Sequence, residues 1–206
     1  YPEYKATREK MPEEMIEQLP FLWNILDSMD IPLLEEPGFE ADDIIGTLAT
    51  QASKKGLDVY IVSGDKDFMQ LINDKIFLYA PSGRQADIKI YDKQGVEDKW
   101  GVPPEKIIDL LGLMGDSSDN VPGVMGVGEK TAVKLIQEYG SLEASLENAN
   151  NVKNKRAREG LLNSKENAIL SKELVTIETQ MDLKINLSDL NTNNIKKESL
   201  AEIFQE

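Results

Sequence analysis

The sequence predicts an α/β fold in which a partial, mostly parallel sheet flanked by helices is joined to a helical subdomain. In the first half, helical segments alternate with short β-branched runs, the clearest of them at 59–62. The second half has an almost entirely helical pattern, and a glycine-rich turn at 121–128 leads into it. We therefore expect an α/β core over 1–120 and a helical subdomain over 121–206, packed together as one unit.

The composition predicts a soluble, cytoplasmic protein and restricts its chemistry. The 206 residues are 40% hydrophobic and 29% charged, and no apolar run approaches the roughly 20 residues needed to span a bilayer. The sequence contains no Cys and no His, so catalysis must use carboxylates, Lys, Arg, Tyr, hydroxyl groups or a bound metal. Because Tyr1 stands where a Met would begin a protein and no signal-peptide pattern follows, we expect the chain to be part of something longer.

Two helices and one strand are predicted for the first third of the chain. The first helix starts at 12–14, and Pro20 must kink or divide it. The second opens at 39–43 and ends at Gly56. The compact apolar run at 59–62 is typical of an interior strand of a parallel sheet. The predicted inner face of the first helix consists of Ile16, Leu19, Leu22, Trp23, Leu26 and Met29.

The rest of the core is predicted to contain a short helix, a hairpin and two further helices. Pro103-Pro104-Glu105 is typical of a first helical turn, and Pro81-Ser82-Gly83 is typical of a turn between strands. The expected positions are 66–72 for the short helix, 76–79 and 88–91 for the strands, and from 93 and from 103 to 114 for the helices.

Three groups of acidic residues stand out in this chain of net charge −14. Each group alone has an ordinary structural explanation, because acids are common in first helical turns and in loops after strands. Together they favour a binding site, since open α/β sheets bind ligands at the carboxyl ends of their strands. The groups are Glu40, Asp42 and Asp43; Asp65 and Asp67; and Asp116 and Asp119.

Carboxylates that converge in this way require a cation, because like charges a few ångströms apart raise one another's pKa. An all-oxygen ligand set without His or Cys favours Mg²⁺ or Mn²⁺ over zinc. Two such ions about 4 Å apart can activate a water and stabilise the entering and leaving oxygens of phosphoryl transfer. The acidic groups therefore predict a metal site for phosphoester chemistry.

The glycine-rich segment 121–132 is a second candidate binding site. Gly126 and Gly128 precede a helix directly, so that a phosphate can approach the backbone amides closely. From 121 to 165, seven basic residues stand against five acidic ones. The segment predicts a clamp on the DNA backbone, which recognises shape rather than base sequence. A helix-hairpin-helix corner without a ligand is the structural alternative, and a nucleotide P-loop does not fit because Glu129 separates Gly128 from Lys130.

Five motifs occur in the order in which bacterial 5′ nuclease domains have them. The chain resembles the 5′–3′ exonuclease domains of bacterial DNA polymerase I, which are relatives of flap endonucleases. The resemblance covers the first two thirds of the chain. The motifs are Tyr4-Lys5-Ala6-Thr7-Arg8, Glu40-Ala41-Asp42-Asp43, Ser63-Gly64-Asp65-Lys66-Asp67, Met114-Gly115-Asp116-Ser117-Ser118-Asp119-Asn120 and Gly126-Val127-Gly128-Glu129-Lys130-Thr131-Ala132.

The resemblance implies a metal-dependent nuclease that removes 5′ ends and flaps, including RNA primers, in DNA replication and repair. It implies two Mg²⁺ ions, with Mn²⁺ as a substitute, and it implies that Asp43 and Asp119 lie nearby or act through water. Lys5 and Arg8 match residues that contact the scissile phosphate and offset charge in the transition state. The implied metal ligands are Glu40, Asp42, Asp65, Asp67 and Asp116.

The resemblance also implies that the glycine hairpin and the next helix form a helix-three-turn-helix element, which holds duplex DNA, often with a bound K⁺. We further expect a monomer that does not bind membranes and that shares its parent chain with a polymerase domain. The expected DNA-binding residues are Gly123, Gly126, Val127, Gly128, Lys130, Thr131, Lys134, Lys155, Arg156 and Arg158.

The sequence departs from the family at its start, where members carry two further metal-binding Asp residues upstream of the Tyr-Lys motif. We therefore expect this piece alone to bind Mg²⁺ weakly and to be nearly inactive. An alternative to the nuclease is a DNA-structure-binding fragment without catalysis. A phosphatase of small phosphomonoesters is a third possibility, but it requires neither the glycine hairpin nor the basic run at 153–158.

Overall fold

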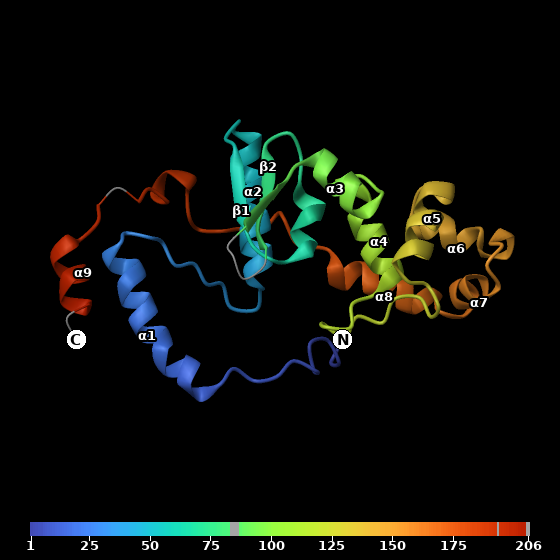
Figure 1. The fold of residues 1–206 in the computed structure, drawn as a ribbon, viewed down its shortest axis with the longest axis horizontal. Helices are drawn as coiled ribbons and strands as arrows, with labels where there is room; N and C mark the ends of the chain where they lie inside the picture. The colour runs from blue at the N-terminus through green and yellow to red at the C-terminus, as the bar shows by residue number, and fades with distance from the viewer. Residues whose placement is uncertain (83–86, 193, 205–206) are drawn as a thin grey trace.

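The computed structural model describes residues 1–82, 87–192 and 194–204, and it confirms the α/β core joined to a helical half (Figure 1). The core contains a three-stranded sheet in the order β1-β2-β3. β1 (Val59–Val62) is parallel to β2 (Ile76–Ser82), and β2 is antiparallel to β3 (Asp87–Tyr91). The predicted hairpin is therefore present, but its turn is misplaced, because Pro81 and Ser82 continue β2 and pair with β3. Gly83 of the predicted turn lies outside the described residues.

β1 lies at the edge of this described sheet, so the expectation of an interior strand is wrong for it. Ile61 is buried, but Tyr60 and Val62 are 57% and 67% exposed. The Tyr60 ring stacks on that of Phe77 with centroids 5.2 Å apart. A short β-branched run indicates that one face of a strand is buried. It does not determine whether neighbouring strands are hydrogen-bonded along both edges of that strand.

Helices cover the sheet on one side and continue from it. α2 (Ala41–Lys54) packs beside β1 and ends before Gly56, whose φ of +83° is readily adopted by glycine. The 3₁₀ helix η1 (Lys66–Leu71) follows β1, as the sequence predicts. After β3, Asp92 caps α3 (Lys93–Trp100) by accepting a hydrogen bond of 2.8 Å from the Gly95 amide.

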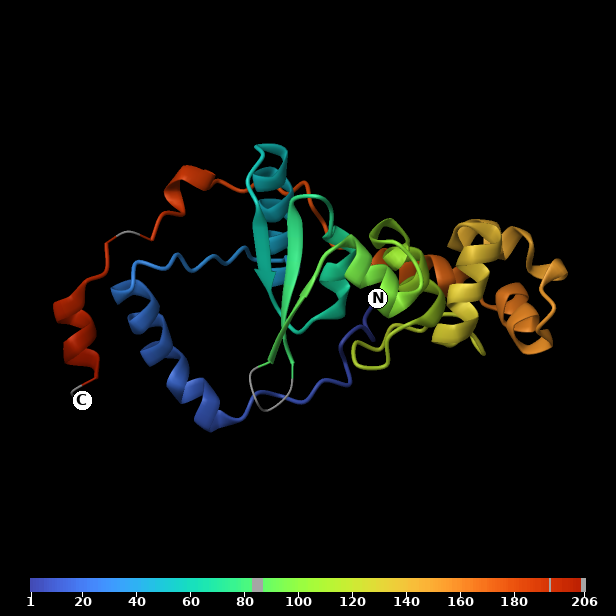
Figure 2. The same ribbon diagram turned by 45° about the horizontal axis from the view of Figure 1, so that its top comes forward.

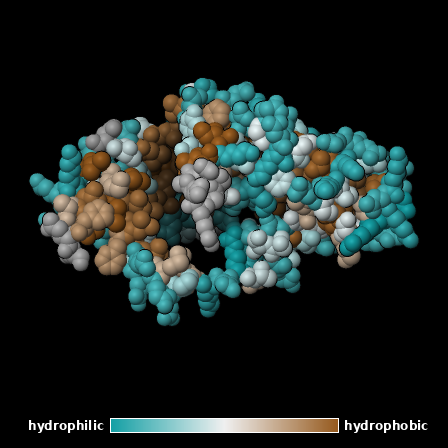
Figure 3. All heavy atoms as spheres, viewed as in Figure 1, coloured by the Kyte–Doolittle hydropathy of each residue, from teal (hydrophilic) through white to brown (hydrophobic). Residues whose placement is uncertain are grey.

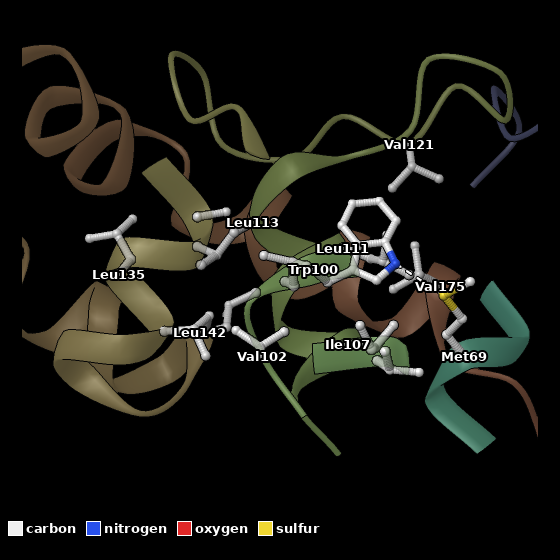
Figure 4. Close-up of a cluster of buried hydrophobic side chains, with 14 of the residues drawn as sticks. Met69, Trp100, Val102, Ile107, Leu111, Leu113, Val121, Leu135, Leu142 and Val175 are labelled. Carbon is white, nitrogen blue, oxygen red and sulfur yellow. Dashed lines mark hydrogen bonds between the residues drawn. The ribbon is translucent and has the colours of Figure 1, made fainter. Parts of the chain in front are cut away.

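The hydrophobic core is centred on α4 (Ile107–Met114), which follows the 3₁₀ helix η2 (Pro104–Lys106). Leu110 and Leu113 have no exposed surface, and the Trp100 indole donates a hydrogen bond of 3.0 Å to the Met69 sulfur (Figure 4). The same cluster extends from the sheet into the helical half. One continuous core therefore holds both halves together.

The helical half packs against α4 through three of its helices. Its elements are α5 (Glu129–Tyr139), α6 (Leu142–Glu147), the 3₁₀ helix η3 (Ala149–Asn151), α7 (Lys155–Asn163) and α8 (Lys165–Val175). α8 packs closely on α4, because Gly112 has no side chain where the Lys172 backbone approaches. The chain then returns past the sheet through the 3₁₀ helix η4 (Leu187–Asp189) to α9 (Lys197–Ile203).

α1 (Glu13–Ser28) lies apart from the core and packs against α9 (Figures 1 and 2). Pro20 lies inside it without dividing it. The predicted inner face is not buried in the core, since Ile16, Leu22 and Trp23 are 48% to 51% exposed, and apolar side chains are visible on this part of the surface (Figure 3). Apolar periodicity therefore predicted the helix correctly but not its burial.

Along the described part of the chain, no helix combines the length and apolar character that crossing a membrane requires.

Close backbone packing at Gly160 generates a stability prediction. A Cβ at Gly160 would lie 2.0 Å from the Met125 carbonyl oxygen. We expect Gly160→Ala to lower the free energy of unfolding by about 2–3 kcal/mol, because this backbone contact must open. In urea denaturation, Gly64→Ala should change it by less than about 0.5 kcal/mol, since a Cβ there meets nothing within 4 Å. Equal stabilities of the two variants would contradict the packing argument.

Candidate active site

All seven predicted acidic residues line two adjoining hollows near the carboxyl end of β1. The first hollow has a volume of about 210 Å³ and the second about 250 Å³. Asp67 and Asp119 line both, so that they lie at the boundary between the hollows. The first hollow also contains Glu40, Asp42 and Asp43, and the second Asp65 and Asp116.

The turn after β1 positions Asp65 and Asp67. The Asp65 amide donates to the Ser63 hydroxyl at 3.0 Å. The Asp65 carboxylate then caps η1 by accepting a hydrogen bond of 2.9 Å from the Asp67 amide. A 3₁₀ helix thus starts at Lys66, and the two acids reach the second hollow from a capped turn rather than from an extended strand.

Asp116 is held by the loop that follows α4. Its Oδ1 accepts hydrogen bonds from the amides of Ser118 and Asp119 at 2.7 and 3.3 Å, and its backbone pairs with Val121. Its Oδ2 is contacted by the Lys66 ammonium group. Burial opposes ionisation of Asp116, but the hydrogen bond from Lys66 and the two amides together hold its pKa below the ordinary value.

The first residues of the chain are anchored to the loop after Asp116. The Lys5 amide donates to the Asp119 carbonyl at 2.9 Å, and the Asn120 side chain donates to the Glu3 carbonyl at 2.7 Å. The Arg8 guanidinium donates to Asp119 Oδ1 at 2.6 and 3.0 Å, and the Lys5 ammonium contacts Glu40. Both predicted phosphate-contacting residues therefore lie beside the hollows.

Asp67 and Asp42 show that negative charge in this region is incompletely compensated. Burial raises the pKa of Asp67 to about 6. Asp67 Oδ1 is buried and has no hydrogen-bond partner within the described structure, although the Lys66 ammonium lies 3.4 Å away. Burial, followed by the charges of Asp65 and Glu40, also raises the pKa of Asp42.

Asp43 differs from its neighbours because both of its oxygens are used by the backbone. Oδ2 accepts from the Glu40 amide at 3.1 Å, and Oδ1 accepts from the Glu178 amide at 2.9 Å. The first bond stabilises the start of α2, and the second ties α2 to the segment after α8. In this structure Asp43 therefore positions the site.

The donor set fits a hard divalent cation. All candidate donors are carboxylate oxygens, and the orphaned Asp67 Oδ1 is the kind of group that such an ion would satisfy. In the residues that the structure describes, no three acidic side chains are arranged to hold a metal ion as they lie. Instead, the Lys5 ammonium group contacts Glu40, and the Lys66 ammonium group contacts Asp116.

A strap formed by residues 175–181 supports the hollows, and sequence reasoning missed it. The Gln70 side chain donates to the Val175 carbonyl at 2.9 Å and accepts from the Ile177 amide at 3.0 Å. The buried Thr47 hydroxyl donates a hydrogen bond of 3.3 Å to the Glu178 carbonyl. Gln70 and Thr47 belong to no recognisable motif, so the sequence does not indicate that they support the site. Lys66, in contrast, lies within the predicted Asp65-Lys66-Asp67 motif, and its charge next to two acids is the signal that could have identified it as the partner of Asp116.

The glycine-rich turn packs directly on the loop that carries Asp116. The Gly123 amide donates to the buried Ser171 hydroxyl at 2.8 Å, and the Val127 amide donates to the Val124 carbonyl at 3.0 Å. These two amides are therefore used inside the protein. Gly126 has a φ of +81°, and no acceptor among the described residues occupies its amide or that of Gly128.

Basic side chains surround this turn. Arg156 of α7 lies across Gly126, where an added Cβ would be 2.6 Å from Arg156 Cγ. Arg158 donates to the Val152 carbonyl at 2.9 Å, whereas Lys155 is exposed and 3.9 Å from Glu159. On α5, Lys130 and Lys134 are exposed and Thr131 is partly buried. The turn, the start of α5 and α7 form one surface.

The raised pKa of Asp67 generates a prediction for the metal-free protein. The folded state favours the protonated carboxyl, whose pKa is about 6 rather than the ordinary 3.8. The protonated carboxyl therefore stabilises the folded state at low pH, and this contribution is lost as the pH rises from about 3.8 through about 6. In EDTA at pH 7, we expect Asp67→Asn to raise the free energy of unfolding by about 1–2 kcal/mol. In urea denaturation, the extra stability of Asp67→Asn should shrink toward pH 4. Extra stability that does not depend on pH would contradict the raised pKa of Asp67.

Comparison with known proteins gives matches over nearly the whole chain. Residues 1–101 match the family model of the 5′–3′ exonuclease N-terminal resolvase-like domain, and residues 102–198 match that of the 5′–3′ exonuclease C-terminal SAM fold. The chain is 44% identical to DNA polymerase I of Bacillus subtilis over 206 residues and 46% identical to that of Rhizobium leguminosarum over 190. It spans 23% and 18% of the lengths of these relatives.

Solved structures share the fold. The 5′-exonuclease of bacteriophage T5 is similar with a TM-score of 0.73 and 22% identity, over 99% of this chain and 77% of that chain. The catalytic core of Rad2 is similar with a TM-score of 0.61 and 17% identity, over 95% and 63%. Because the two family models together account for residues 1–198, the chain belongs to the 5′–3′ exonuclease family.

Proposed function

We propose that the chain is a metal-dependent 5′–3′ exonuclease and flap endonuclease, which hydrolyses phosphodiester bonds at 5′ ends, nicks and flaps of DNA, including RNA primers. The observation that carries this proposal is the meeting of seven carboxylates in two adjoining hollows beside a glycine turn with exposed basic side chains. The similar T5 and Rad2 structures support it, since they are described as complexes with metal ions or DNA.

The proposed metal ions are two Mg²⁺, for which Mn²⁺ can substitute. When bound, such ions activate water and stabilise the charge on the leaving oxygen. Asp119 lies at the edge of the proposed ligand set and holds Arg8, and Asp43 orients the start of α2. The proposed ligands are Glu40, Asp42, Asp65, Asp67 and Asp116.

Lys5 and Arg8 are the proposed contacts to the scissile phosphate. Burial disfavours the Lys5 ammonium, but its hydrogen bond to Glu40 raises its pKa, so the side chain keeps its positive charge. Arg8 is about half exposed and held by Asp119, so its guanidinium is oriented by a carboxylate while remaining accessible. Two fixed positive groups at this position stabilise the extra charge of the transition state.

The glycine turn is the proposed DNA clamp. The amides of Gly126 and Gly128 and the first turn of α5 can bind phosphate oxygens, and the proposed K⁺ site lies at the same turn. Gly123, Val127 and Arg158 would act by shaping the surface. Side-chain contacts are proposed for Lys130, Thr131, Lys134, Lys155 and Arg156.

We propose a functional boundary near residue 120, with the metal site before it and the clamp after it. DNA, as flap, nick or primer duplex, is the proposed partner of both. We also propose that the chain acts as a monomer in the same polypeptide as a polymerase domain, in the bacterial cytoplasm close to the nucleoid. Its similarity to DNA polymerase I supports this placement.

Loss of a proposed ligand should abolish cleavage. In the full-length protein with Mg²⁺, we expect Asp65→Ala to slow cleavage of a 5′-flap substrate by more than about 100-fold. Asp58→Ala removes a carboxylate that is 60% exposed and paired with Lys75 on the surface, and it should leave the rate unchanged. An unchanged rate in Asp65→Ala refutes the assignment. Nicked-duplex binding that survives EDTA, together with no hydrolysis by the full-length protein even with Mg²⁺, supports the non-catalytic alternative.

Charge reversal on α5 tests the clamp. We expect the double variant Lys130→Glu, Lys134→Glu to bind nicked duplex about 10- to 100-fold more weakly. The slope of log affinity against log salt concentration should fall by the amount that corresponds to roughly two lost phosphate contacts. The control is Lys54→Glu with Lys55→Glu at the other end of the core, where both side chains are also exposed. Equal effects of the two pairs would show a non-specific charge effect, and a phosphatase of small substrates would be insensitive to either.

A further inference from the structure

Lys66 is a cation inside the second hollow to which the proposed mechanism gives no role. Its ammonium group contacts Asp116 Oδ2 and lies 3.4 Å from Asp67 Oδ1. Its side chain is 34% exposed, and those of Asp116 and Asp67 are 11% and 19% exposed. One partly buried ammonium group thus bridges two more deeply buried carboxylates.

Within the described residues, backbone amides bond neither of the two oxygens near Lys66. Asp116 Oδ1 is bonded by the amides of Ser118 and Asp119, whereas Oδ2 is contacted by Lys66. Asp67 Oδ1 has no hydrogen-bond partner in the described structure. A divalent ion bound by Asp116 would compete with Lys66 for Oδ2, because the other oxygen of this carboxylate already accepts two amide hydrogen bonds.

We infer that Lys66 is a built-in competitor of the divalent ion, an internal counter-cation that binds Asp116 and Asp67 in the metal-free protein and is displaced when the metal binds. The inference rests on the proposed function, since it assumes that these carboxylates bind metal. Lys66 then lowers metal affinity and stabilises the metal-free fold. It acts on the reaction through the carboxylates and is a positioning residue.

The chemistry of lysine suits such an exchange. An ammonium group is a compact point charge on a flexible four-carbon chain, so it can leave a carboxylate without moving the backbone. Lys66 starts η1, next to the Asp65 cap, so its main chain is fixed while its side chain can turn toward solvent. Lys75 forms the corresponding pair with Asp58 on the open surface, at 2.8 Å with 45% of its side chain exposed, and it provides a matched control.

The test measures Mn²⁺ binding and thermal unfolding in the full-length protein. For Lys66→Met we expect about tenfold tighter Mn²⁺ binding by titration monitored with electron paramagnetic resonance, as for the loss of one competing charge-assisted contact. In EDTA its melting temperature should fall, and the rise on adding Mg²⁺ should exceed that of the unmodified protein. Lys66→Arg keeps the charge and should not bind Mn²⁺ more tightly, and Lys75→Met should match the unmodified protein.

Three results would count against the inference. Unchanged or weaker Mn²⁺ binding in Lys66→Met, with binding still lost in Asp116→Asn, would show that Lys66 supports the ligands instead of competing, and the metal site would stand. Tighter binding in Lys75→Met as well would indicate a general charge effect and overturn the specific role. Mn²⁺ binding that Asp116→Asn leaves unaffected would refute the metal site, and the inference with it. Should Lys66→Met not fold, Lys66→Gln provides the same comparison.

Discussion

The mutual repulsion of carboxylates is the constraint on which the rest of this structure depends. Seven acidic side chains gather around two small hollows in a chain that already carries a net charge of −14. Such an arrangement is tolerated only where each charge meets a donor or a cation, or where the carboxyl binds a proton. The fold meets this requirement with Lys5, Arg8, Lys66 and a set of backbone amides. Asp67 marks where the compensation is incomplete, since its pKa is raised and its Oδ1 has no hydrogen-bond partner among the residues that the structure describes.

The supporting structure fixes this arrangement from several parts of the chain. The strap at 175–181 reaches back from the helical half to Thr47 and Gln70. The loops on either side of Asn120 touch through Gly115 and Gly123, where no Cβ could be accommodated. Because these contacts cross the boundary between the core and the helical half, the acidic hollows and the glycine turn are held in one rigid frame. The function proposed above, in which DNA is bound at both places at once, requires such support.

The sequence was most informative where a residue type has a local physical meaning. The acid groups, the glycine turn and the elements at 59–62, 66–72 and 103–114 could be predicted, because caps, turns and apolar periods act over a few residues. The edge position of β1 and the exposure of α1 could not, since both depend on what packs against them. Which oxygens are free is also set by tertiary contacts. The Glu178 amide, 135 residues along the chain, occupies one oxygen of Asp43, and nothing in the motif around Asp43 indicates this contact.

The Lys5–Glu40 contact also has a topological consequence. Lys5 and Glu40 flank the segment that contains α1, and their ion pair joins its two ends. Lys196 attaches the far side of this segment through the Ser28 carbonyl and Asp27. The segment is therefore a closed loop of polypeptide, held at its ends by this ion pair together with the contacts of residues 3–8 to Asp119 and Asn120. Closing a loop of this length costs configurational entropy that grows only slowly with its size, so these few polar contacts are enough to hold its ends together.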